Sequence, residues 1–95
     1  MAFELRYSEE KNQILKATRG INFEEVISCM AQGKLLDDKS HPDPSKSHQR
    51  IYIVQIDIYA YVVSCVIDRN KEEIFLKTVY PSRKYTEKYI KKGEL

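Results

Sequence analysis

The amino-acid sequence predicts a small α+β domain in which an antiparallel sheet packs against a helix hairpin, with a short helix at the C-terminus. Three observations lead to the element order β-α-α-β-β-β-α. Helically spaced apolar residues fill the first third of the chain, β-branched and aromatic runs follow, and a proline separates the last run from a basic segment. The 95 residues suffice for one domain spanning 1–95, near the lower size limit for a single apolar core.

The N-terminal third predicts one short strand and two helices. Residues 3–7 alternate apolar and polar side chains, as in a half-buried strand. Ser8 is placed to cap the first helix and Gly20 to end it in a left-handed conformation. Asn22 caps the second helix, which we expect to end at Gly33. The second helix has one apolar face, formed by Phe23, Val26, Ile27, Met30 and Ala31.

The middle of the chain predicts a brief strand at residues 34–38, an exposed polar loop at 39–49, and two strands at 50–58 and 60–68. Apolar residues occupy both odd and even positions of the two longer strands, which predicts that both faces of the sheet are covered. Because isoleucine disfavours positive φ, Ile58 argues against a two-residue hairpin, and we expect a longer or bulged turn.

The C-terminal segment combines positive charge with tyrosines. A strand at residues 73–80 ends at Pro81, and Ser82 is placed to cap the final helix. Between Lys77 and Lys92 there are six Lys or Arg residues and one acidic residue, whereas the whole chain carries a net charge of +2. Cations bind phosphates and aromatic rings stack on unpaired bases, so the mixture favours RNA. A solvated helix whose tyrosines pack on the sheet explains the same pattern.

Other classes of protein receive little support from the sequence. No apolar run reaches the ~20 residues of a membrane span, and the first residues lack the pattern of a signal peptide, so we expect a cytoplasmic protein. Cys29 and Cys65 are expected to be buried free thiols. His41 and His48 share the polar loop with aspartates, but their spacing matches no zinc or calcium pattern. We therefore expect neither a metal ion nor a cofactor.

The remaining candidates for chemistry are cationic and phenolic side chains. Arg50 begins a strand and Arg83 follows one, so the two guanidinium groups would grip a scissile phosphate if they converge. A metal-free ribonuclease also needs groups that take and return a proton. Lys77, Tyr80, His48 and the aspartates all remain open for that role. The residues expected to hold RNA are Lys84, Tyr85 and Lys88.

The chain resembles the BrnT-type toxins of bacterial type II toxin–antitoxin systems, which share the RelE-like ribonuclease fold. Five short segments carry the resemblance: residues 8–12, 19–26, 37–38, 49–50 and 81–89. The resemblance implies a toxin that cleaves RNA and inhibits translation until a cognate antitoxin neutralises it. By the same similarity, Arg50 and Arg83 act on the substrate phosphate, and any contact with operator DNA is made through the antitoxin.

A second hypothesis comes from a different class. The same fold would serve as a non-catalytic interaction module, whose apolar strands and uncovered sheet edge dock a partner protein. Growth arrest and RNA cleavage would distinguish the two hypotheses.

Overall fold

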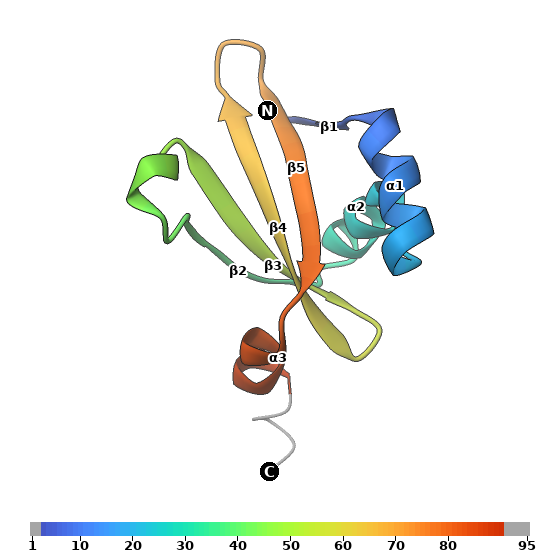
Figure 1. Ribbon diagram of the computed structural model, residues 1–95. Coiled ribbons are helices and arrows are strands. Elements are labelled where there is room, and N and C mark those ends of the chain that lie inside the picture. The colour runs from blue at the N-terminus through green and yellow to red at the C-terminus, as the bar shows by residue number, and fades with distance from the viewer. Residues whose placement is uncertain (1–2, 91–95) are drawn as a thin grey trace.

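Five strands form one mixed sheet in the order β1-β5-β4-β3-β2 in a computed structural model that describes residues 3–90 (Figure 1). Three α-helices surround the sheet, so the predicted α+β class is confirmed. The strands are β1 (Glu4–Tyr7), β2 (Leu35–Ser40), β3 (Gln49–Ile56), β4 (Tyr59–Asp68) and β5 (Glu73–Pro81). The helices are α1 (Glu9–Arg19), α2 (Phe23–Ala31) and α3 (Arg83–Tyr89), and Pro44–Lys46 adds a 3₁₀ turn between β2 and β3.

The sheet differs from the predicted one in two ways. The brief strand expected at residues 34–38 is a full member, β2, which runs antiparallel to β3 and extends to Ser40. The element order is therefore β-α-α-β-β-β-β-α. The sheet is also not wholly antiparallel, because β1 pairs with β5 in parallel, from Glu4 beside Glu73 to Tyr7 beside Leu76.

The helix ends follow the capping residues. The Ser8 side chain accepts a hydrogen bond from the Lys11 amide, and the Asn22 side chain accepts one from the Glu25 amide at 2.7 Å. Gly20 adopts φ 72°, the left-handed conformation that ends α1. These predictions are confirmed. No described helix combines the length and apolarity that crossing a membrane requires.

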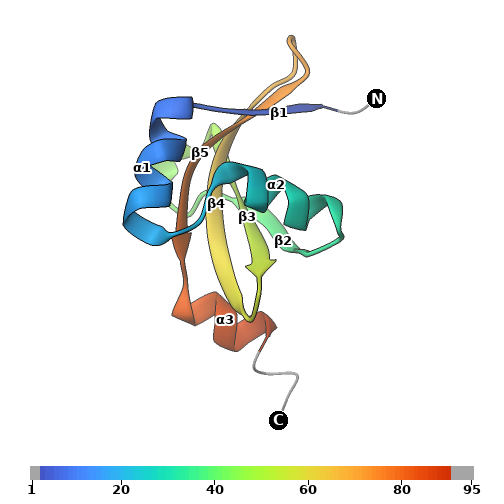
Figure 2. The ribbon, with the colours of Figure 1, turned by 90° about the vertical axis from the view of Figure 1, so that its right-hand side faces the viewer.

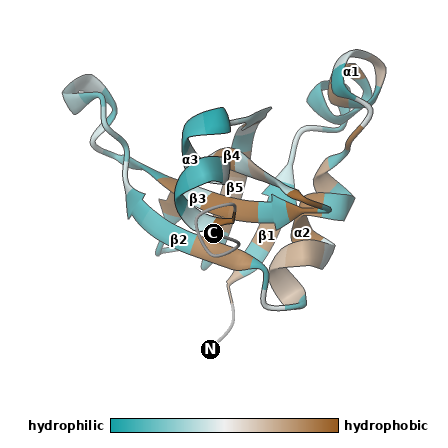
Figure 3. Ribbon diagram, turned by 90° about the horizontal axis from the view of Figure 1, so that it is seen from below, coloured by the Kyte–Doolittle hydropathy of each residue, from teal (hydrophilic) through white to brown (hydrophobic). Residues whose placement is uncertain are grey.

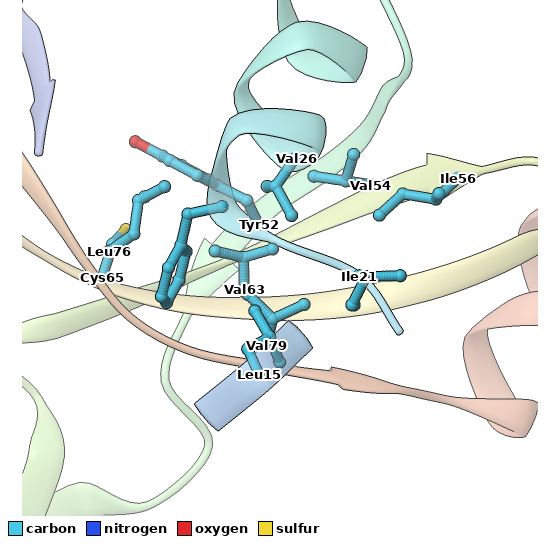
Figure 4. Packing of buried hydrophobic residues seen from close by; sticks show 11 residues of the cluster. Leu15, Ile21, Val26, Tyr52, Val54, Ile56, Val63, Cys65, Leu76 and Val79 are labelled. Carbon is cyan, nitrogen blue, oxygen red and sulfur yellow. The ribbon is translucent and has the colours of Figure 1, made fainter. Parts of the chain in front are cut away.

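Buried side chains lie on both faces of the sheet, as the continuous apolar strands predict. The face turned toward α2 packs Phe23 and Val26 against alternate residues of β3 and β4 (Figure 4). The opposite face packs α3 against Ile51, Ile53, Ala60 and Val62. Seen from below, α2 and α3 lie on opposite sides of the sheet, and α1 lies beyond the β5 end of it (Figure 3).

A buried asparagine joins α1 to α2. The Asn12 side chain is 0% exposed; its Oδ1 accepts a hydrogen bond from the Phe23 amide at 2.7 Å, and its Nδ2 donates to Glu24 at 3.3 Å. The Phe23 ring stacks on Tyr7 of β1 with ring centroids 5.2 Å apart. These contacts hold α1 close to the edge of β5 without laying it across the sheet.

The turn between β3 and β4 contradicts the expected longer loop. Ile56 pairs directly with Tyr59, so the loop contains only Asp57 and Ile58. Asp57 adopts φ 57°, and Ile58 does not have positive φ. Only the first of the two loop residues therefore has the positive φ that isoleucine disfavours. The isoleucine is therefore tolerated because aspartate takes the left-handed position.

The pairing of β4 with β5 contains an irregularity at Lys77. Ser64 pairs with Thr78 while the adjacent Cys65 pairs with Leu76, so Lys77 has no partner of its own. An extra residue of this kind is a β-bulge, which redirects side chains locally. Lys77 thus leaves the alternation of β5, which explains how a lysine fits between apolar neighbours.

Candidate nucleic-acid interface

The position of α3 depends on hydrogen bonds to Ala60 of β4. The Ser82 amide donates to the Ala60 carbonyl at 2.9 Å, and the Ala60 amide donates to the Thr86 hydroxyl at 2.8 Å. Thr86 in turn donates to the Ser82 carbonyl at 2.7 Å and is only 1% exposed. The Ser82 side chain caps the helix by accepting from the Tyr85 amide at 3.2 Å. These bonds place Arg83 and Lys84 at the end of β5.

Two tyrosines of α3 pack on the sheet and carry cations on their outer surfaces. Tyr85 and Tyr89 lie against the buried residues of β3 and β4, with ring centroids 5.9 Å apart. Lys39 of β2 and Lys84 each place an ammonium group within 5.4 Å of the centre of the Tyr85 ring. Lys88 takes the same position over Tyr89 at 5.2 Å. The packing supports the amphipathic interpretation of α3, and the cations at its surface are compatible with phosphate binding.

The far end of α3 is tied to β2 by a tyrosine–aspartate pair. The Tyr89 hydroxyl donates a hydrogen bond to the Asp37 carboxylate, which also accepts one from the Asp38 amide at 2.8 Å. The bond from Tyr89 holds the pKa of Asp37 below its ordinary value, because it stabilises the carboxylate. The same bond raises the pKa of Tyr89 to about 12, because it stabilises the protonated phenol.

The Tyr89–Asp37 pair makes the docking of α3 depend on pH at both ends of the scale. Because the pKa of Asp37 is lowered from 3.8, its hydrogen bond stabilises the folded state at pH values above 3.8. This contribution disappears as the pH falls below that value. A phenol whose pKa is raised from 10.0 to about 12 contributes below pH 10, and its contribution is lost between these values. We expect NMR titration to give Tyr89 a raised midpoint that returns toward 10.0 in Asp37→Asn. An unchanged midpoint in that variant would contradict the pairing.

A polar hollow lies beside α3 on the same face of the sheet. Its volume is about 330 Å³. Ser64 and Thr78 are hydrogen bonded through their hydroxyl groups at 2.5 Å, and Ser64 is buried. Among residues 3–90, no Asp or Glu lines this space. We call it the α3-face hollow, and its lining residues are His41, Lys46, Gln49, Ile51, Ser64, Lys77, Thr78 and Tyr80.

Two of the residues predicted for catalysis meet in the α3-face hollow. Lys77 reaches it from the bulge of β5, and Tyr80, which is 45% exposed, lines it from the same strand. Ile51 joins the hollow to α3, because Ile51 lines the hollow, packs in the cluster under Tyr85, and pairs with Lys39. The hollow and α3 therefore lie next to each other on the same face of the sheet, which we call the α3 face.

The histidine that lines the hollow is His41, whereas the sequence analysis considered His48 for proton transfer. His41 accepts a hydrogen bond on Nδ1 from the Asp43 amide at 3.1 Å. Its neutral form therefore carries the proton on Nε2, which remains able to donate. His48 is exposed in the turn before β3 and does not line the hollow.

Arg50 lies apart from the other predicted residues. Arg50 lies two residues before the buried Tyr52 in β3, so both side chains are on the same face of the sheet, which α2 covers. There its Nε donates to Asp38 at 2.7 Å, and this bond raises the pKa of the guanidinium group. Arg50 pairs with Cys65 of β4, and Pro81 pairs with Tyr61 of the same strand. Cys65 and Tyr61 are four residues, or about 13 Å, apart along β4. Because Arg83 follows Pro81, this length of strand and the thickness of the sheet separate it from Arg50. The two arginines do not converge.

The sequence patterns did not predict that four residues, named below, lie at the α3 face. Lys39, Lys46 and His41 belong to segments far from β5 in the sequence, and Ser64 is a single polar residue inside an apolar strand. Only the polar Ser64 was a usable signal, because a serine in an apolar run indicates a partner for its hydroxyl group. The pairing of β2 with β3 brings His41 and Lys46 to the hollow that residues of β5 also line. The spacing of residues in the sequence does not reveal this pairing.

The cysteines and the potential metal ligands do not gather at this surface. Both cysteines are free; Cys65 is buried, and Cys29 is only partly buried, which differs from the expectation for it. Burial raises the pKa of Cys65 to about 11, so this thiol is unreactive at neutral pH. Within the described part of the chain, no three His, Cys, Asp or Glu side chains cluster as metal ligands would.

Comparisons of the chain with models of protein families, with characterised proteins and with solved structures gave no significant match in any of the three.

Proposed function

We propose that the chain is a metal-independent endoribonuclease of the toxin type, with a RelE-like topology and its RNA site on the α3 face. The observation that carries the proposal is the hollow itself. It brings Lys46, Lys77, His41 and Tyr80 around two hydroxyl groups, with no carboxylate in its lining among residues 3–90. Cations bind the phosphate, and an imidazole or a phenol takes and returns protons without a metal ion.

In this proposal, each group on the α3 face has a distinct role. Lys46 and Lys77 hold the scissile phosphate. His41 takes the proton of the 2′-hydroxyl as its oxygen attacks phosphorus and the bond to the 5′-oxygen breaks, and Tyr80 donates a proton to that leaving oxygen. Arg83 and Lys84, at the start of α3, bind neighbouring phosphates together with Lys88. Tyr85 already packs on the sheet, and its contribution is to orient the lysines above its ring.

The proposed biological setting follows from the sequence resemblance. The protein acts in the bacterial cytoplasm on RNA and inhibits translation, and a cognate antitoxin protein encoded nearby neutralises it. Contact with operator DNA occurs only through that antitoxin. Expression of the chain alone is then expected to arrest bacterial growth.

Two matched pairs of variants test the site. Purified protein incubated with total RNA in chelator is expected to cleave it, and His41→Ala is expected to lose cleavage while His48→Ala keeps it. Likewise, Arg83→Ala is expected to lose cleavage while Arg50→Ala keeps it, because Arg50 lies on the other face of the sheet. Folding is checked for each variant by circular dichroism. Equal activity within both pairs would exclude the α3 face as the site.

A non-catalytic interaction module is the second candidate, and a specific feature favours it. The outer edge of β5 is open beside an apolar groove, which is the kind of surface a partner segment uses. Folded protein that neither cleaves RNA in chelator nor arrests growth would favour this function over the first.

A further inference from the structure

A second hollow lies between α1 and the outer edge of β5, where β1 ends. β1 pairs with β5 only as far as Leu76, and past that residue no described strand lies beside the outer edge of β5. The chain turns at Ser8 into α1, which runs alongside the uncovered part of β5 (Figures 1 and 2). The space between them has a volume of about 530 Å³. We call this space the edge groove.

The walls of the edge groove are apolar, and its rim is positively charged. Ile14, which is 56% exposed, lines it from α1, and Leu15 and Val79 form part of its wall. Ile14 therefore adds an exposed apolar side chain to the wall of the groove. Three cations line the groove, and none of them forms an ion pair with another residue of the described chain: Lys11, Arg19 and Lys77. No Asp or Glu from residues 3–90 lines it.

We propose that the edge groove binds an extended segment of a partner protein, in which apolar side chains alternate with acidic ones. Such a segment continues the line of β1 and pairs with the open backbone of β5 between Lys77 and Tyr80. Side chains of a strand alternate between two sides. The apolar set therefore meets Ile14 and Val79, while the acidic set meets the cations at the rim.

Other occupants fit the edge groove less well. A second copy of the chain would bring the same three cations together, and their mutual repulsion disfavours pairing of two identical edges. RNA would use the cations but would leave the apolar wall and the open backbone of β5 without partners. An acidic and apolar strand satisfies all of these features.

The edge groove and the α3-face hollow share a wall. Lys77, Thr78 and Tyr80 line both of them. A segment bound in the groove therefore contacts the residues that hold phosphate in the proposed function, and it excludes RNA from the hollow. This competition rests on the proposed function, whereas binding of the segment does not.

An NMR titration tests the binding directly, using a short peptide of alternating valine and glutamate. Expected results are shifts at Ile14 and at Lys77 to Tyr80, with slower hydrogen exchange of the outward amides of β5. A peptide N-methylated at alternate amides and one with lysine in place of glutamate serve as controls, and both are expected to bind at least about tenfold more weakly. The full chain is used throughout.

Two charge-reversal variants of the protein test whether the cations at the rim contribute to peptide binding. Lys11→Glu, at the rim, is expected to weaken peptide binding by about tenfold, whereas Lys71→Glu, in the distant turn between β4 and β5, leaves it unchanged. Shifts that avoid β5, equal binding of the lysine peptide, or no binding at about 1 mM peptide would each overturn the proposal. Self-association of the chain through this edge would also overturn it.

The competition is measured separately by titrating the peptide into protein mixed with single-stranded RNA. Displacement of RNA supports the shared wall, and simultaneous binding of both refutes it. If the protein binds no RNA, the proposed function fails. Hydrogen exchange of the outward amides of β5 still decides whether the peptide binds in the edge groove.

Discussion

Replacement of Thr86 by valine is expected to lower the free energy of unfolding by about 1–3 kcal/mol. Valine keeps the shape of the side chain but removes the hydroxyl group that accepts from the Ala60 amide and donates to the Ser82 carbonyl. The Ala60 amide would then be buried without a partner, since Ala60 is 0% exposed. Chemical denaturation monitored by circular dichroism measures this loss. RNA binding is expected to fall with it, because the same bonds place α3.

Two further substitutions separate the lost hydrogen bond from other effects. Thr18→Val removes a hydroxyl group that donates to the Ile14 carbonyl at 2.8 Å on the exposed surface of α1, so we expect a change within about 0.5 kcal/mol. Thr86→Ser keeps both hydrogen bonds and is expected to retain most of the stability. A Thr86→Val protein as stable as the unmodified chain would show that the Ala60 amide finds another partner.

Charge reversal at the half-buried Lys77 is expected to weaken RNA binding more than reversal at any exposed lysine. Lys77 lines the α3-face hollow from a bulge, so Lys77→Glu removes one phosphate contact and adds repulsion without disturbing the pairing of β5. We expect affinity for single-stranded RNA to fall at least about tenfold, and the slope of log K against log salt to fall by about one. Fluorescence anisotropy across a salt series measures both quantities.

The control for Lys77 is a lysine of equal charge far from the α3 face. Lys71 lies exposed in the turn between β4 and β5, so Lys71→Glu changes the net charge by the same amount. Its affinity is expected to stay within about twofold of the unmodified protein at moderate salt. If both reversals weaken binding equally, the effect comes from net charge, and the hollow is not the RNA site.

Features that depend on neighbouring residues in the chain were predicted correctly. Ser8, Asn22 and Ser82 cap their helices as expected, because a cap bonds an amide three residues away. Burial of both faces of β3 and β4 was also predicted, because these strands have apolar residues at both odd and even positions. The turn at Asp57 was not, because its geometry depends on which of two adjacent residues takes the positive φ.

Contacts between distant segments could not be predicted from these patterns. Alternation identified β1 as a strand but contained no information on its neighbour, so its parallel pairing with β5 was missed. Arg50 begins its strand as expected, yet its side chain lies on the α2 face and is bonded to Asp38. His41 and His48 look equivalent in the loop sequence, and only the continued pairing of His41 with Gln49 brings one of them to the hollow.

The sequence by itself determined the α+β class, the caps, the strand that stops at Pro81, and the basic, tyrosine-rich segment that follows. These features are local, because they depend on backbone preferences and on hydrogen bonds within one turn. The tertiary structure decided which charges share a surface, because that depends on strand register. Through its bulge, Lys77 lines both the α3-face hollow and the edge groove, while the register of β3 separates Arg50 from Arg83.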